Sequence, residues 1–191
     1  RAMPTIVGPF QGQFVIAHSA GSNVSIALNG EAVSDLQQTR LMVEYRYVPL
    51  DYYFITSRDT DKSVLDAAAG WIRTGLSFPV FVGDTAGRVG ISRYYFDQVA
   101  RGGARGSHFY TLVQAEKAAL NALNPTNRTS PQLPYNEGID SFAFAPAVEG
   151  VGGSCAVGQI PVHRLFRGNV KFPDDPNHRF TTSLAIYNQF V

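Results

Sequence analysis

The stretch SHFYTLVQAEK (107–117) recurs twice in altered form, and this recurrence decides how the chain is organised. The other copies are DYYFITSRDTD (51–61) and NHRFTTSLAIY (177–187). All three contain a small polar residue, a His or Tyr, a bulky residue, an aromatic, an Ile or Thr, and a polar helix start. A recurring segment of this kind predicts one supersecondary unit used several times. The alignment places Tyr52, His108 and His178 at one position, and Phe54, Tyr110 and Phe180 at another.

The similarity continues upstream of these stretches. Short aromatic runs precede each copy, and alternating Tyr, Phe and Val in short runs is typical of strands. Each run carries a charged residue at a matching place, namely Glu44, Arg93 or Arg164. The runs are VEYR (43–46), SRYYF (92–96) and HRLF (163–166).

Downstream, two copies have apolar residues at helical spacing. In the first copy Ser57 is a candidate N-cap, and the helix is expected to end near Gly70. Each helix is followed by a return segment with a glycine turn and alternating aromatics, GWIRTGLSFPVF (70–81) and PYNEGIDSFAFAP (134–146). One unit is therefore predicted to run strand, strand, short helix, strand.

We expect an α+β, β-rich fold in which three such units are arranged around a pseudo-threefold axis, each burying its aromatics against the next. The third unit has no return segment, so we expect the N-terminal segment or residues beyond Val191 to supply its closing strand. Residues 1–40 do not match the repeat. They are expected to form a β hairpin, from QGQFVIAH and NVSIALNGE, or to be the tail of a preceding domain. The repeat domain then covers residues 41–191, with units at about 41–83, 88–148 and 155–191.

Composition narrows the range of partners. Charged residues make up 16% of the chain, below the typical value of about 25%. With 16 basic and 15 acidic residues the chain lacks the positive field that captures nucleic acid or anionic membranes. It also lacks an apolar run of about 18 residues, so no transmembrane helix is predicted. The single cysteine, Cys155, lies in a glycine-rich loop, where it is either a free thiol or one half of a lost disulfide.

The ordered set YYFIT, SHFYT, GWIRTG and CAVGQIPVHRLF with NHRFTTS resembles the HFYTTS-repeat domains of secreted and cell-surface bacterial proteins, a family of unknown function. The likeness covers residues 41–191. It implies an extracytoplasmic, non-catalytic module that sits beside hydrolase or adhesin domains and binds glycans or the cell wall. The chain departs from the family pattern at Tyr52, where the first copy usually has His, and at Leu112, where the second usually has Thr.

The aromatic and histidine residues could form a binding platform, because sugars stack on aromatic faces while polar groups bond their hydroxyls. The alternative is that these aromatics are core, that the histidines satisfy buried backbone groups, and that Arg93 and Arg164 pair with carboxylates or carbonyls between copies. The predicted ligand-binding residues are Trp71, Tyr94, Tyr95, Arg101, Arg105, His108 and His178.

Other chemistries are less well supported. PDDPN (173–177) reads as a solvated acidic turn, so we expect no metal, and no cofactor motif is present. AHSAG (17–21) imitates a nucleophile elbow at Ser19, with His178 and Asp174 or Asp175 following, but hairpin-like residues follow it where a helix is required. The expected function is recognition of a glycan or cell-surface component. The alternatives are a structural or protein-interaction domain that docks a neighbouring domain, and a serine hydrolase.

Overall fold

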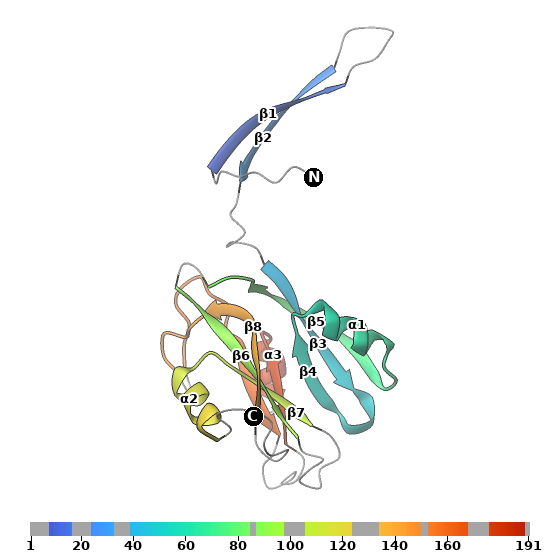
Figure 1. Cartoon of the computed structure of the whole chain (residues 1–191), viewed down its shortest axis with the longest axis vertical. Helices are drawn as coiled ribbons and strands as arrows, with labels where there is room; N and C mark the ends of the chain where they lie inside the picture. The colour runs from blue at the N-terminus through green and yellow to red at the C-terminus, as the bar shows by residue number, and fades with distance from the viewer. Residues whose placement is uncertain are drawn as a thin grey trace.

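The fold is α+β and strand-rich, as the sequence predicts. The computed structural model describes residues 8–16, 24–32, 39–84, 87–97, 106–123, 134–149, 153–167 and 176–189, with only the backbone of the first two ranges. In chain order (Figure 1), the described elements are β1 (Gly8–Ile16), β2 (Val24–Ala32), β3 (Thr39–Tyr47), the 3-10 helix η2 (Val48–Leu50), β4 (Tyr52–Thr56), α1 (Asp59–Ala67), β5 (Trp71–Phe81), β6 (Arg88–Phe96), β7 (Ser107–Thr111), α2 (Gln114–Leu123), β8 (Tyr135–Phe144), β9 (His163–Arg167), β10 (Asn177–Thr181) and α3 (Leu184–Gln189).

The strands form three antiparallel sets. β1 pairs with β2, in the segment where a hairpin is expected. Six strands form the main sheet in the order β4-β3-β5-β8-β6-β7, and β9 pairs with β10. Within the main sheet β5 and β8 meet only through Phe81 and Phe142. The sheet therefore consists of two three-stranded halves, β4-β3-β5 and β8-β6-β7, joined at one narrow place.

The strands β4, β7 and β10 are buried in the same way, at their first, fourth and fifth residues. Each ends in a threonine that pairs with the preceding strand, with Thr56 opposite Val43, Thr111 opposite Ser92 and Thr181 opposite His163. This register corrects the sequence alignment by one residue in the first copy, because Tyr53, and not Tyr52, shares the second position. Two consecutive tyrosines fit the aromatic pattern equally well, so only strand pairing separates them. The second position holds Tyr53, His108 and His178, and the fourth holds Ile55, Tyr110 and Phe180.

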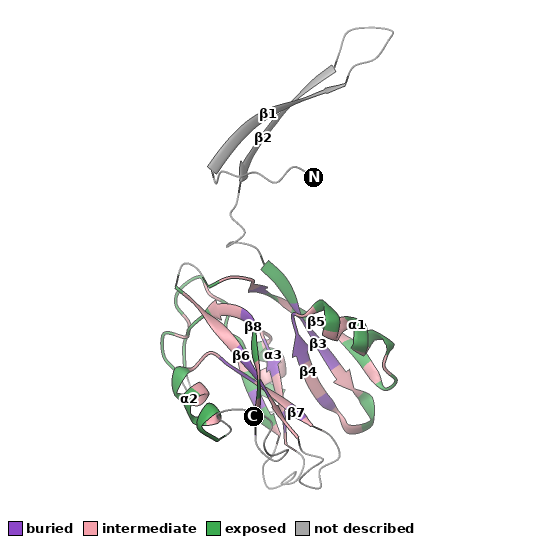
Figure 2. Ribbon diagram, in the orientation of Figure 1, coloured by how far each residue is buried: buried purple, intermediate pink, exposed green. Residues whose placement is uncertain are grey.

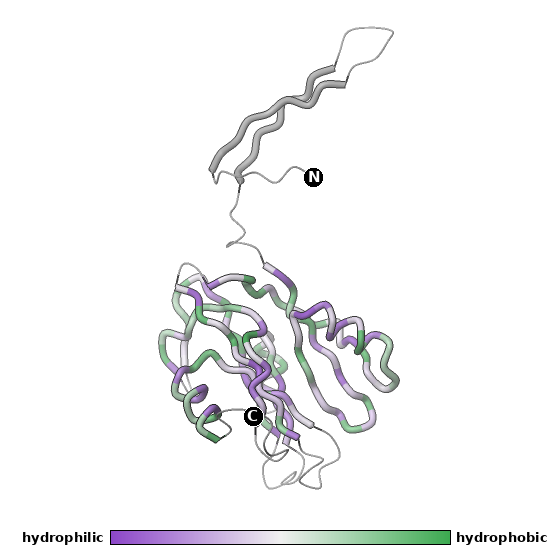
Figure 3. The backbone as a smooth tube through the Cα atoms, viewed as in Figure 1, coloured by the Kyte–Doolittle hydropathy of each residue, from purple (hydrophilic) through white to green (hydrophobic). Residues whose placement is uncertain are grey.

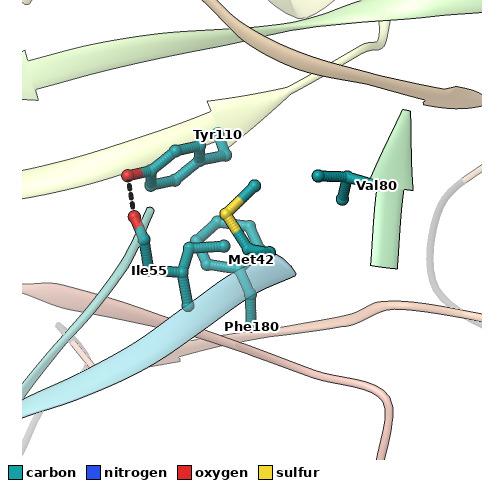
Figure 4. Packing of buried hydrophobic residues seen from close by; sticks show 5 residues of the cluster. All are labelled: Met42, Ile55, Val80, Tyr110 and Phe180. Carbon is teal, nitrogen blue, oxygen red and sulfur yellow. Dashed lines mark hydrogen bonds between the residues drawn. The ribbon is translucent and has the colours of Figure 1, made fainter. Parts of the chain in front are cut away.

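The three fourth-position side chains meet in the core. Tyr110 and Phe180 pack edge to face with ring centroids 5.3 Å apart, and the Tyr110 hydroxyl donates a hydrogen bond to the Ile55 carbonyl (Figure 4). Burial raises the pKa of Tyr110 well above its usual value, which keeps the hydroxyl protonated as a donor. Met42 and Val80 complete this cluster. The core is thus assembled from strands that lie far apart in the sequence.

The helices lie outside this core. None of the residues of α1, α2 or α3 is buried, whereas the buried residues gather on the strands (Figure 2). Polar and apolar residues are mixed along the strands (Figure 3), as expected where one face is buried and the other is not. Of the described helices, none has the length and apolarity needed to cross a membrane.

A threonine turn sets the start of each helix. The Oγ1 atoms of Thr56, Thr111 and Thr181 each accept a hydrogen bond from the backbone N–H two residues later, at 3.0–3.1 Å. Such side-chain bonds turn the backbone from strand toward helix. The expected N-cap, Ser57, is wrong, because α1 is preceded by Arg58 and Ser57 instead donates to Asp140 Oδ2 at 2.7 Å. The helix also ends at Ala67, short of Gly70.

Candidate functional site

A cavity of about 310 Å³ lies where β4, α1 and β5 face β6, β7 and β8. Its volume is at the lower end of the range found for small-molecule sites, roughly 300–1,000 Å³. A second hollow, beside Glu44 and Phe180, encloses only about 30 Å³. The larger cavity is therefore the stronger candidate. It is lined by Tyr52, Tyr53, Phe54, Asp61, Val64, Leu65, Trp71, Arg93, Tyr95, Gly106, His108, Glu137 and Asn177.

One wall of the cavity is a row of aromatic rings from four strands. The ring centroids of Trp71 and Phe54 are 6.3 Å apart, and those of Phe54 and His108 are 4.6 Å apart. His108 in turn packs against Tyr95 at 5.0 Å. Trp71 opens β5 and is half-buried, whereas the next residue, Ile72, is 49% exposed on the opposite face. The row presents ring faces and edges suited to an apolar surface of a ligand.

A charged wall adjoins the rings and centres on Arg93 of β6, which is 5% exposed. Its guanidinium forms ion pairs with Asp61 of α1 and with Glu137 of β8, where Nε lies 2.7 Å from Oε2. The same Glu137 oxygen lies 3.2 Å from His108 Nε2. Burial acts to raise the pKa of Glu137, but His108 and Arg93 outweigh it and the pKa lies below its usual value. Glu137 therefore remains a carboxylate at neutral pH.

A β-bulge positions Glu137. The register of β8 against β6 shifts between Ser92 and Tyr94, and Gly138 there has a φ of +85°. This backbone conformation is open to glycine and strained for other residues. Bulges redirect the neighbouring side chains, which accounts for the approach of Glu137 to Arg93.

Behind this wall a further carboxylate is fully buried. The side chain of Asp140 has no exposure, and its Oδ1 lies 3.4 Å from Arg58 Nε and 3.7 Å from Arg93 Nη1. Together with Asp61 and Glu137, this gives three carboxylates for two guanidinium groups. The cluster carries one uncompensated negative charge when His108 is neutral.

The predicted site residues fall in different places. Trp71, Tyr95 and His108 line the cavity. Tyr94 does not, because successive residues of a strand face opposite sides. It is 1% exposed, and its hydroxyl hydrogen-bonds Asn121 Oδ1 at 3.0 Å. Arg101 and Arg105 lie outside the described residues.

His178 is separate from the cavity. Its ring packs between Phe109 and Phe166, with centroid distances of 4.9 and 4.7 Å. Burial, reinforced by the charge of Arg164, lowers the pKa of His178 to about 4. This histidine is therefore neutral at physiological pH and packs as part of the structure.

The arginines predicted to pair with carboxylates do so. Besides Arg93, Arg164 forms a two-pronged ion pair with Glu116 at 2.7 and 2.9 Å, and it lies over the ring of Phe109. A third pair, Arg179 with Glu44 at 2.9 and 3.0 Å, was not foreseen from the sequence.

Sequence reasoning also missed Asp61 and Glu137. One available signal was spacing, because Asp61 follows Thr56 by five residues, as Glu116 follows Thr111, and each threonine hydroxyl bonds that carboxylate. Glu137 has no counterpart signal, because its position depends on how β8 pairs with β6.

The structure assigns no site to the other chemistries considered. Ser19, Asp174 and Asp175 lie outside the described residues, and Cys155 is a half-buried free thiol. Among the residues that are described, no three His, Cys, Asp or Glu side chains are grouped to hold a metal ion. Comparison with protein-family models, curated proteins and solved structures found no match. The resemblance to HFYTTS-repeat domains thus stays a prediction from the motifs.

Proposed function

We propose that this chain is a non-catalytic, extracytoplasmic recognition module whose cavity binds a glycan or another cell-surface component. The observation that carries the proposal is the row of rings from Trp71 to Tyr95 along a cavity that also contains Glu137. Sugars combine apolar C–H faces with hydroxyl groups, so a ring wall beside a carboxylate suits them. The placement outside the cytoplasm rests on the family resemblance alone.

We further propose that the described units follow a pseudo-threefold arrangement, with residues 41–83, 88–148 and 155–191 as the three copies. Equivalent residues make the same type of contact at each junction. Phe54 packs on His108, Phe109 packs on His178, and Arg179 lies 4.0 Å over the ring of Tyr53. This series runs from the first unit to the second, to the third and back to the first. The candidate cavity belongs to the first junction, where the return strands β5 and β8 add Trp71 and Glu137.

A glycan array followed by calorimetric titration tests the binding function. We expect Trp71→Ala to weaken binding of any glycan identified by at least about fivefold. Stacking of a nucleic-acid base on an aromatic side chain contributes about 1–3 kcal/mol, and we expect a similar contribution from a sugar face on Trp71. The matched control is Ile72→Ala, which truncates the next side chain on the opposite, exposed face. Equal affinity of the two variants would reject the cavity as the binding site, provided that both unfold cooperatively at similar denaturant concentrations.

A structural or protein-interaction role is the second candidate. Phe166 of β9 and Leu184 of α3 are 56% and 58% exposed, and within the described residues β9 pairs only with β10. Exposed apolar side chains beside an unpaired strand edge are suited to docking a neighbouring domain. Wild-type protein that binds no glycan on the array would favour this role over glycan recognition.

A further inference from the structure

We infer that the ligand of the cavity carries a positive charge, and that within the glycans it is an amino sugar with free ammonium groups. This inference rests on the proposed glycan-binding function and names the class of sugar that the cavity selects.

The first argument is the charge of the cavity. The carboxylates of Asp61, Glu137 and Asp140 outnumber the guanidinium groups of Arg58 and Arg93 by one. Besides Arg93, the only basic residue in the described lining of the cavity is His108, whose Nε2 lies 3.2 Å from Glu137 Oε2. An unmatched carboxylate in a partly buried setting is costly unless a cation neutralises it. A ligand ammonium group supplies that charge. A glycan bearing carboxylates or sulfates would instead be repelled.

The second argument is the position of the unmatched carboxylate. Oε2 of Glu137 is buried between Arg93 and His108, while its Oε1 makes no ion pair or hydrogen bond with the described residues. The Glu137 side chain as a whole retains 19% exposure. Its second oxygen can therefore accept a hydrogen bond from a ligand without breaking the contact with Arg93.

The third argument is the ring wall, because aromatic faces attract cations and tryptophan does so most strongly. The Arg93 guanidinium already lies 5.8 Å from the ring centroid of Phe54. An amino sugar offers both an apolar face for stacking on Trp71 and an ammonium group for Glu137. A neutral sugar offers the Glu137 carboxylate only uncharged hydroxyl groups, and a simple amine offers the rings no apolar face.

Trp71 is the only tryptophan of the chain, so its fluorescence reports directly on the cavity. The experiment titrates wild-type protein with tetramers of glucosamine, N-acetylglucosamine and glucose, and with tetralysine, at a pH where the amines are protonated. We expect the glucosamine tetramer to bind about tenfold more tightly than each of the others. Glu137→Gln should remove this preference, whereas Glu149→Gln, at an exposed acid outside the cavity, should keep it.

A measurement on wild-type protein alone covers the case in which Glu137→Gln does not fold. Added salt should weaken binding of the glucosamine tetramer and leave binding of the glucose tetramer nearly unchanged, since salt screens charge pairs.

The outcomes separate the inference from the function on which it rests. Equal affinity for the three sugars would overturn the amino-sugar inference and leave glycan binding standing. Tetralysine binding as tightly as the glucosamine tetramer would overturn the assignment to a sugar. A preference that survives in Glu137→Gln, or is indifferent to salt, would overturn the charge argument. If none of the four ligands binds detectably, the inference is overturned, and the result also counts against the proposed function.

Discussion

Asn177 of β10 hydrogen-bonds both backbone groups of Tyr53 in β4, a residue 124 positions earlier in the chain. The Tyr53 N–H donates to Asn177 Oδ1 at 2.8 Å, and Asn177 Nδ2 donates to the Tyr53 carbonyl at 3.2 Å. The amide side chain thus acts as a partner strand would. Nδ2 also lies 3.4 Å from Ser107 Oγ in β7, so one buried side chain connects the three strands β4, β7 and β10.

Replacement of Asn177 by alanine should therefore weaken the fold. The change leaves the backbone groups of Tyr53 without these partners, at a cost of about 1–3 kcal/mol in the free energy of unfolding. Urea denaturation followed by circular dichroism measures it. Asn188→Ala, at an exposed position on α3, is the control and should have little effect. A similar stability for both variants would show that Asn177 does not hold the strands together.

The core predicts a contrast between two phenylalanines. Phe180 is 8% exposed and packs on Tyr110, whereas Phe166, on the neighbouring strand, is 56% exposed. Phe180→Ala should lower the free energy of unfolding by about 3–5 kcal/mol, because it removes buried apolar area and leaves a cavity. Phe166→Ala should cost less than half as much. Comparable losses in denaturant titrations would argue against a core built on Phe180.

Arg93 should be the least replaceable of the arginines that line the cavity or border it. In Arg93→Met, Asp61 and Glu137 lose their shared cation in a partly buried setting, and we expect a loss of about 3–5 kcal/mol in unfolding free energy. Arg73 also pairs with a carboxylate, Asp66, but on the surface. Arg73→Met should change stability far less because solvent screens that pair. The reverse order of the two variants in chemical denaturation would contradict the buried-cluster interpretation.

Because His178 is buried, we expect the free energy of unfolding to fall in mild acid. Burial lowers its folded-state pKa to about 4, below the 6.5 of an exposed histidine. The unfolded chain then gains a proton first, so stability is complete above about pH 6.5 and is lost as the pH falls toward 4. By pH 5 the loss should be about 2 kcal/mol. The carboxylates with lowered pKa values, including Asp61 and Glu137, lose their contributions only at lower pH.

His178→Phe keeps an aromatic ring and removes the titration. Denaturant midpoints measured at pH 7, 6 and 5 should fall for the wild type and stay nearly level for this variant. Parallel falls in both proteins would show that another group is responsible.

The sequence anticipates the order of elements because local signals specify it. Aromatic runs mark β3, β6 and β9, and helical spacing marks α1 and α2. Details that depend on strand pairing could not be predicted from the sequence. Because Tyr52 and Tyr53 are the same residue type, either one can be aligned with His108 in the sequence. Only the pairing of β4 with β3 shows that Tyr53 is the equivalent residue. Likewise, the Ser57 hydroxyl could cap a helix or bond another strand, and the partner on β8 decides.

The candidate site was foreseen in part for a similar reason. Trp71, Tyr95 and His108 stand out as aromatic or polar residues in the repeated pattern, but nothing in the chain order brings them together. Their meeting depends on the strand order β5-β8-β6, which is not sequential. The same strand order brings Glu137 to Arg93. Tyr94 was expected to line the same site as Tyr95. Successive residues of a strand point to opposite faces, so the Tyr94 side chain instead contacts Asn121 of α2.

The most direct test of the central claim is a nitrogen-edited NMR titration of the wild-type protein with the glucosamine tetramer. We predict that the single indole resonance, from Trp71, shifts together with the backbone amides of Phe54, His108 and Glu137, since these four residues line one cavity. Shifts confined to the region of Phe166 and Leu184, with the Trp71 signal unmoved, would contradict the account.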